Sequence, residues 1–135
     1  MNAPDHHPQY RIATLGRREI GIGVWNRASA SASPPLVICN GIGMNMEVLA
    51  PLAAMLADRM VIAFDPPGIG RSADPWLPYT AGMAANWIAG LLDTLEVPVA
   101  DLFGFSWGGA IAQQFAIQHK RRIRRLALAA IGPGW

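Results

Sequence analysis

The chain has 135 residues, of which 52% are hydrophobic and 15% are charged, and its formal net charge is +2. This length is enough for one domain that buries roughly two-thirds of the surface exposed by its unfolded form. Many apolar and few charged residues suit a sheet covered by helices on both faces. Five of the eleven lysines and arginines lie between Lys120 and Arg125. We interpret them as the charged end of a helix, not a phosphate-binding patch, so nucleic acid is not an expected partner.

The cysteine content and the hydropathy of the chain argue against several further classes of protein. Cys39 is the only cysteine, so a disulfide framework and a cysteine-based metal cluster are excluded, and a buried inert thiol is expected. The first twenty residues contain no continuous apolar segment of the kind found in secretory signals. The uncharged stretches 75–92 and 102–118 are interrupted by polar residues, so neither is expected to span a membrane. We therefore expect a cytoplasmic protein.

The predicted elements alternate along most of the chain. Residues 1–9 are polar and are expected to form a disordered tail before a domain at 10–135. Strands are predicted at 10–15 and 19–25, followed by a loop at 28–33, a strand at 36–39, a helix near 50–57 and a strand at 60–64. A helix follows from Thr80, with Met83, Trp87, Leu91 and Leu95 on one face, and then a strand at 100–105, a helix at 107–119 and a strand at 123–131. This order predicts right-handed crossovers and a mostly parallel sheet.

A short motif between the last two strands indicates nucleophilic chemistry. Gly104-Phe105-Ser106-Trp107-Gly108 matches G-x-S-x-G, follows a predicted strand and opens a predicted helix. A nucleophile elbow requires this strand–turn–helix context, because the strained turn projects the serine hydroxyl. Glycines at 104 and 108 would avoid collisions with the neighbouring strand and helix. We predict that Ser106 is the nucleophile; the alternative is a glycine-containing turn with an incidental serine.

Two backbone N–H groups are candidates for an oxyanion hole, which an acyl-transfer serine needs. The N–H of Trp107 lies at a helix N-terminus, where the dipole favours negative charge. The loop after the third strand, Asn40-Gly41-Ile42-Gly43, should supply the second donor, which we assign to Ile42. If the third strand and the elbow strand are parallel neighbours, both N–H groups should converge near the Ser106 hydroxyl. The alternative for this loop is a glycine-permitted turn without a ligand.

A general base for Ser106 is not evident among the three histidines. His119 lies 13 residues along the helix, about 20 Å away, and His6 and His7 lie in the polar tail. No aspartate or glutamate follows Asp101, although the acid and the histidine follow the serine in hydrolases with this elbow. The sequence therefore predicts a nucleophile and an oxyanion hole without a base.

The segment Asp65-Pro66-Pro67-Gly68-Ile69-Gly70-Arg71-Ser72 offers a competing interpretation. Together with Ala73 it contains G-x-G-x-x-A after a strand, as dinucleotide-binding sites do. That motif must open a helix, whereas prolines follow here at 75 and 78. We favour a structural turn in which Asp65 bonds the loop backbone.

Residues 10–135 resemble the α/β-hydrolase superfamily and, within it, the intracellular medium-chain polyhydroxyalkanoate depolymerases. The resemblance is carried by Asn40-Gly-Ile-Gly with Asn45 and Glu47, by VIAFDPPGIGRS at 61–72 and by GFSWGGAIAQQFA at 104–116. It implies an α/β fold, a truncated α/β-hydrolase with the first six strands of a mostly parallel sheet. It also implies hydrolysis of an aliphatic polyester through an acyl-enzyme on Ser106, at the surface of storage granules and without a cofactor or metal. The cap and the strands carrying the acid and histidine would be absent, so the chain alone is expected to be inactive unless a C-terminal half chain completes it.

The same sequence features are compatible with other functions. A different cap would make the protein an esterase, a lactonase or a carbon–carbon bond hydrolase acting on a small molecule. Serine at position 106 argues against haloalkane dehalogenases and epoxide hydrolases, which use aspartate there. A non-catalytic half-fold that binds an acyl ligand or a partner chain is the alternative from outside the enzyme class.

Overall fold

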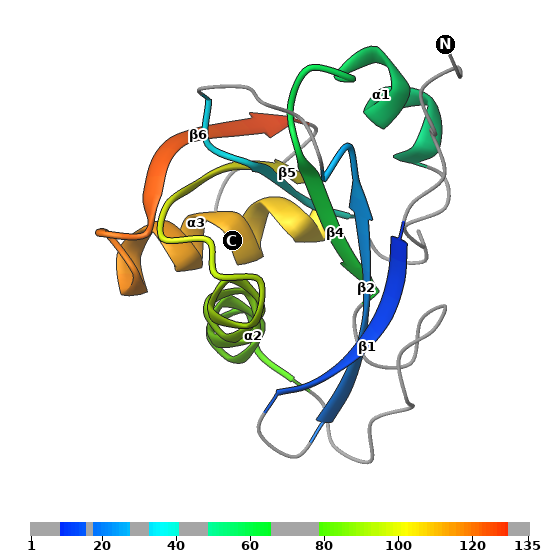
Figure 1. The fold of residues 1–135 in the computed structure, drawn as a ribbon. Coiled ribbons are helices and arrows are strands. Elements are labelled where there is room, and N and C mark those ends of the chain that lie inside the picture. Colours follow the sequence, from blue (N-terminus) through cyan, green and yellow to red (C-terminus); the bar gives the residue numbers. More distant parts are fainter. Residues whose placement is uncertain (1–8, 16–17, 28–32, 41–48, 66–78, 130–135) are drawn as a thin grey trace, which may run out of the picture.

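The computed structural model describes residues 9–15, 18–27, 33–40, 49–65 and 79–129. Within these ranges, six strands form one sheet in the order β1-β2-β4-β3-β5-β6 (Figure 1). The elements are β1 (Gln9–Leu15), β2 (Arg18–Trp25), β3 (Leu36–Cys39), α1 (Ala50–Met55), β4 (Val61–Asp65), α2 (Ala81–Thr94), β5 (Ala100–Phe105), α3 (Trp107–Gln118) and β6 (Ile123–Ala129). None of the helices in these ranges is both long enough and apolar enough to cross a bilayer.

The sheet is mostly parallel, as the alternation of strands and helices predicts. β1 and β2 form an antiparallel hairpin, and β2 joins β4 in antiparallel pairing. From β4 onward the pairs β4–β3, β3–β5 and β5–β6 are all parallel. Consequently β3 and β5, which precede the two loops assigned to the oxyanion hole, are direct neighbours.

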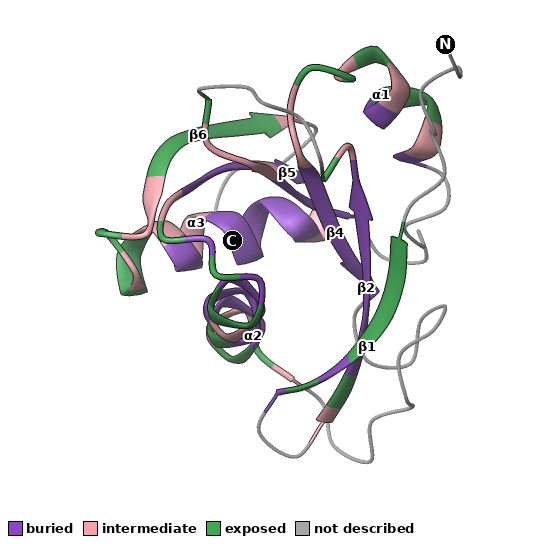
Figure 2. Ribbon diagram, viewed as in Figure 1, coloured by how far each residue is buried: buried purple, intermediate pink, exposed green. Residues whose placement is uncertain are grey.

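Helices cover both faces of the sheet, which confirms the expected layering. The larger hydrophobic cluster joins α2 and α3 to one face and includes Val37 and Cys39 of β3. The smaller cluster joins α1 to the other face and includes Ile38, with Leu36 packed against it. Side chains alternate between faces along a strand, so a continuously apolar β3 supplies both clusters. Figure 2 shows the resulting buried central strands.

Several boundaries differ from the sequence predictions. β1 begins at Gln9, which we had assigned to the tail, because Gln9 pairs with Val24; residues 1–8 lie outside the described ranges. α1 ends at Met55, and the Nδ2 of Asn26 donates to the carbonyls of Ala53 and Leu56 near its C-terminus. β6 is described as far as Ala129.

The predicted face of α2 is correct for Trp87, Leu91 and Leu95 but wrong for Met83, which is exposed. α2 packs against both the sheet and α3, so it buries a wider stripe than one row of residues spaced by four. The additional buried positions are Ala84, Ala85, Ile88, Ala89 and Leu92. The hydroxyl of Thr80 accepts from the N–H of Met83 and caps the helix at the predicted start.

The basic residues after α3 do not serve as the charged end of that helix, so this part of the interpretation is wrong. The last turn of α3 contains no basic residue. Instead, Arg122 donates to the carbonyls of Val97 and Pro98 at 2.9 and 2.7 Å and pairs with Asp93 at 2.8 Å. These contacts hold the start of β6 against the turn between α2 and β5.

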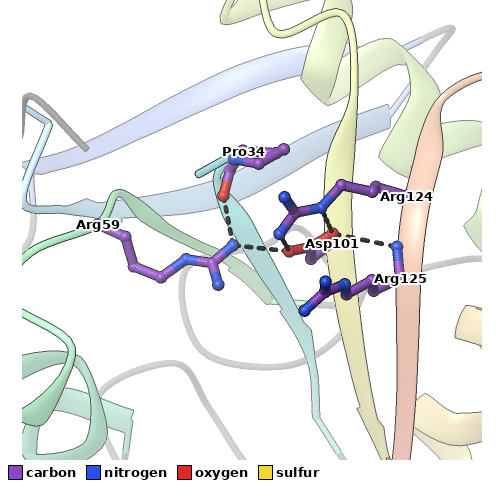
Figure 3. Close-up of polar contacts among 5 residues, drawn as sticks. All are labelled: Pro34, Arg59, Asp101, Arg124 and Arg125. Carbon is purple, nitrogen blue, oxygen red and sulfur yellow. Dashed lines mark hydrogen bonds and ion pairs between the residues drawn. The ribbon is translucent and has the colours of Figure 1, made fainter. Parts of the chain in front are cut away.

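A buried carboxylate joins the amino ends of the parallel strands (Figure 3). Asp101 is 5% exposed, and its oxygens accept from Arg124 at 2.6 and 3.0 Å, from Arg59 at 3.0 Å and from the N–H of Arg125 at 3.0 Å. Arg59 also donates to the carbonyl of Pro34, just before β3. The hydrogen bond from Arg124 is the main cause that lowers the pKa of Asp101 below its usual value. Asp101 thus connects β5 to β6 and to the segments that precede β3 and β4.

We expect Asp101→Asn to lower the free energy of unfolding by about 3 kcal/mol at neutral pH, because the buried negative charge between two arginines is lost and an NH2 donor replaces one acceptor oxygen. The pKa of Asp101 is lowered by folding, so its contribution is present above the unfolded pKa of about 3.9 and is lost as pH falls through the folded value. Urea unfolding from pH 7 to pH 3 checks this: the difference from wild type should shrink below about pH 4. Asp93→Asn, which removes an exposed ion pair, is the control and should lower stability by less than about 1 kcal/mol.

β6 is the outermost strand of the described sheet and leaves one side without a strand partner in those ranges. Leu126 and Leu128 are exposed beside this edge, at 38% and 37%. An unpaired apolar edge is a template for association, so we expect the 135-residue chain to form dimers or larger species at micromolar concentration. Sedimentation velocity checks this, and Leu128→Lys should shift the chain toward monomer. Leu52→Lys on α1 is the control: Leu52 is equally exposed, at 37%, and its substitution should not change the oligomeric state. A monomeric wild-type chain would contradict the prediction.

Candidate active site

Ser106 lies on a strained turn between β5 and α3. Its backbone has φ 55° and ψ −122°, a conformation that non-glycine residues rarely adopt. Two hydrogen bonds hold the turn: the N–H of Ser106 donates to the carbonyl of Ala129 at 3.2 Å, and the N–H of Gly109 donates to the carbonyl of Ser106 at 2.9 Å. The predicted strand–turn–helix position and unusual torsions are therefore confirmed. Strain of about 1–3 kcal/mol of this kind is concentrated at functional sites.

Glycines at 104 and 108 are required by close backbone packing. A Cβ atom at Gly104 would lie 2.6 Å from the Cα of Gly109 and 2.9 Å from the Cβ of Ala112. A Cβ atom at Gly108 would lie 1.9 Å from the carbonyl oxygen of Cys39. No side chain fits at either position, so α3 approaches β5 and the end of β3 as closely as an elbow demands.

The end of β3 lies beside the elbow, as predicted. Cys39 pairs with Gly104 in the parallel ladder. Asn40, the next residue, is 4% exposed, and its backbone oxygen would lie 2.6 Å from a Cβ at Gly108. Gly41 and Ile42 lie outside the described residues, so the convergence of the Ile42 and Trp107 N–H groups stays a prediction. Trp107 begins α3, at the end where the helix dipole favours an anion.

Cys39 is an unreactive thiol. Complete burial raises its pKa to about 12, so the thiolate that acts as a nucleophile is not populated at neutral pH. Its side chain belongs to the cluster beneath α2 and α3. This confirms the predicted buried thiol and leaves Ser106 as the candidate nucleophile of this region.

His119 and Asp101 lie far from Ser106, and the other two histidines lie outside the described residues. His119 follows the far end of α3, with its Nε2 2.9 Å from the Oδ1 of Asn86 and its ring 5.0 Å from that of Phe115. Asp101 lies at the other end of β5, about 17 Å from Ser106 along the strand. His6 and His7 lie outside the described residues. In the described part of the chain, neither His119 nor Asp101 can exchange a proton with Ser106.

The alternative nucleotide motif lies almost entirely outside the described residues. Asp65 is its described member, a buried residue at the end of β4 paired with Gly21. The loop contact that we predicted for Asp65 therefore stays a prediction. One contact of the site was missed from sequence: Ala129 holds the Ser106 N–H through its backbone carbonyl, which no side-chain pattern encodes.

The model of the alpha/beta hydrolase fold family matches residues 34–135, which include β3, the elbow and α3. The chain belongs to this family. It is 46% identical over 126 residues to the poly(3-hydroxyalkanoate) depolymerase of Ectopseudomonas oleovorans, covering 93% of this chain and 44% of that protein. It is 36% identical over 134 residues to the 2-hydroxymuconate semialdehyde hydrolase of Pseudomonas sp. (strain CF600), covering 95% of this chain and 46% of that one.

A solved structure supports the same assignment. The enol-lactonase from Burkholderia xenovorans LB400 superposes with a TM-score of 0.80 at 29% identity, over 90% of this chain and 46% of that one. The chain spans less than half the length of the curated relatives described above. The match covers the part of this hydrolase fold that contains the elbow.

We expect Gly108→Ala to disrupt the elbow, because the added methyl group would overlap the Cys39 carbonyl. The free energy of unfolding should fall by about 3 kcal/mol or more, since a backbone neighbour cannot move as a flexible side chain can. Thermal unfolding followed by circular dichroism measures the loss. Gly90→Ala is the matched control, since its Cβ would meet only the Leu15 side chain, at 3.1 Å, and alanine favours a helix. Equal stability of Gly108→Ala and wild type would contradict the packing argument.

Proposed function

We propose that this chain carries the nucleophile of a serine ester hydrolase that acts on aliphatic polyesters of the poly(3-hydroxyalkanoate) type. The observation that carries the proposal is the strained backbone of Ser106, at φ 55°, between β5 and α3 in a member of the alpha/beta hydrolase fold family. Such a turn presents the hydroxyl at the carboxyl edge of the sheet.

In the proposed reaction, the Oγ of Ser106 attacks the ester carbonyl carbon. The negative charge that develops on the carbonyl oxygen is held by the N–H groups of Trp107 and Ile42. Collapse of the tetrahedral intermediate breaks the bond to the alkoxy oxygen, which leaves as an alcohol and produces an acyl-enzyme on Ser106. Water then attacks the acyl-enzyme, releases the carboxylic acid and restores the serine. No cofactor takes part.

The proton transfers in this scheme require a base and an acid beyond His119 and Asp101, which are too far from Ser106. We propose that they are supplied by chain corresponding to the remaining half of the relatives, either continuous with these residues or as a C-terminal half chain. The site would then act on polymer at the surface of cytoplasmic storage granules.

The choice of substrate is supported by the 46% identity to a poly(3-hydroxyalkanoate) depolymerase. A carbon–carbon bond hydrolase is the second candidate, favoured by the 36% identity to a 2-hydroxymuconate semialdehyde hydrolase over 134 residues. An esterase or a lactonase of small molecules would use the same serine and oxyanion hole. The non-catalytic alternative is a half-fold that binds acyl groups or a partner without turnover.

A chimera tests whether Ser106 of this chain is a working nucleophile, which separates the catalytic candidates from the non-catalytic alternative. Residues 1–135 are joined to the remaining part of the Ectopseudomonas oleovorans depolymerase, with that intact depolymerase as the control for folding and assay. We expect the chimera to release acid from a poly(3-hydroxyalkanoate) suspension, and Ser106→Ala to reduce the rate by at least about 10³-fold. A second chimera joins the same residues to the remaining part of the Pseudomonas sp. (strain CF600) hydrolase; activity of this chimera alone, on 2-hydroxymuconate semialdehyde, would favour the second candidate. A folded chimera inactive on every substrate would support the non-catalytic alternative.

The 135-residue chain alone is compared with the chimera, because it lacks the base that the chimera gains. We expect p-nitrophenyl butyrate hydrolysis far below that of the chimera, because without a triad base only oxyanion-hole and binding effects remain, roughly 10³–10⁴-fold over water. Turnover of the chain alone that matches the chimera and disappears in Ser106→Ala would contradict this expectation and reveal a base within the chain.

A further inference from the structure

Asn40 is the first residue after β3 and lies next to the elbow. Because Cys39 pairs with Gly104, Asn40 and Phe105 are the next residues along the two neighbouring strands, and Ser106 follows directly. The backbone oxygen of Asn40 also approaches the first turn of α3 closely, at 2.6 Å from a Cβ placed on Gly108. Asn40 is therefore held at the carboxyl edge of the sheet, where the nucleophile emerges.

The side chain of Asn40 is buried with an unused donor. The residue is 4% exposed, and its Nδ2 has no hydrogen-bond partner among the residues that the structure describes. An asparagine Nδ2 carries two donor hydrogens, and burying them without an acceptor is unfavourable. Two other polar side chains are satisfied: the Nδ2 of the part-buried Asn26 contacts three carbonyls between 3.1 and 3.2 Å, and Asp101 accepts from two arginines.

Three other buried nitrogens in the described ranges also lack a partner, but none combines this with a position beside the serine. Arg59 bonds Asp101 through its Nη2, and the guanidinium of Arg18 stacks 5.2 Å from the ring of Trp87. Trp25 pairs with Val61, the first residue of β4, and so lies at the opposite edge of the sheet from Ser106. A buried unpaired donor at a functional edge calls for an acceptor that arrives with a ligand.

We propose that the Asn40 carboxamide donates a hydrogen bond to the carbonyl oxygen of an ester bound at Ser106. The inference rests on the proposed function and adds a side-chain donor to the two backbone N–H groups. A neutral N–H donor fixed by burial requires little reorganisation when the carbonyl oxygen becomes an oxyanion. The hydrogen bond would strengthen as that charge develops.

The test uses the 135-residue chain labelled with ¹⁵N, with Leu128→Lys in every sample to favour the monomer, and the ester methyl 3-hydroxybutyrate as probe. The side-chain NH₂ signals of Asn40 are assigned by their loss in Asn40→Asp. We expect these signals and the backbone amide of Trp107 to shift along one binding curve as the ester is added. Asn40→Asp should raise the Kd about tenfold, because a donor is replaced by an acceptor that repels the carbonyl oxygen. Gln113→Glu, the same amide-to-carboxylate change on α3, should leave the Kd unchanged.

Three outcomes would overturn the proposal. The Trp107 amide could move while the Asn40 side-chain signals stay fixed, both could stay fixed over the whole solubility range of the ester, or Asn40→Asp could bind as tightly as wild type. If Asn40→Asp fails to fold, the Asn40 side-chain signals are instead assigned sequentially in the chain that retains Asn40. Their chemical-shift changes on addition of the ester then decide the test. An inactive chimera together with a shifting Asn40 amide would reject the polyester hydrolase and leave the donor role in place.

Discussion

A Cβ atom on Gly108 would lie 1.9 Å from the carbonyl oxygen of Cys39, so helix α3 meets the end of β3 backbone to backbone. This contact determines where the first turn of α3 lies. Because a Cβ atom on Gly104 would also lie only 2.6 Å from the Cα of Gly109, the chain must reverse sharply between β5 and α3, and Ser106 adopts φ 55° in the space that remains. The same contact buries Asn40 beside the turn. The strain at the serine is thus imposed by packing on both sides and is not a property of the loop itself.

The two edges of the parallel strands are held by different forces. At the amino edge, Asp101 and its arginines join β5 and β6 to the segments before β3 and β4 through charge. At the carboxyl edge, the strands and α3 are joined by close contact between backbones that leaves no room for side chains. The buried carboxylate is about 17 Å from Ser106 along β5, so its charge can stabilise the sheet without acting on the proposed nucleophile. The charged contacts that stabilise the sheet and the proposed site at Ser106 therefore lie at opposite ends of the strands.

The sequence predicts the local parts of this arrangement well because they are encoded by neighbouring residues. Apolar runs locate β3 and β5, and the glycines around Ser106 locate the elbow. Strand order is less accessible: β4 lies between β2 and β3, an arrangement made by pairing between distant segments. The exposure of Met83 and the pairing of Arg122 and Arg124 with aspartates more than twenty residues away also depend on tertiary contacts. The predicted donor Ile42 lies outside the described residues.

The placement of Ser106, the proposed nucleophile, also depends on the outermost strand of the described sheet. The N–H of Ser106 donates to the carbonyl of Ala129 at the end of β6, so the elbow is anchored to a strand whose own leucines are exposed. Anything that pairs with the side of β6 that has no strand partner in the described ranges, or that covers Leu126 and Leu128, would restrict the motion of that strand and hence of the serine. Covering this edge and fixing Ser106 would therefore be one event. The elbow motif is local in sequence, but the rigidity of the turn also depends on how firmly β6 is held.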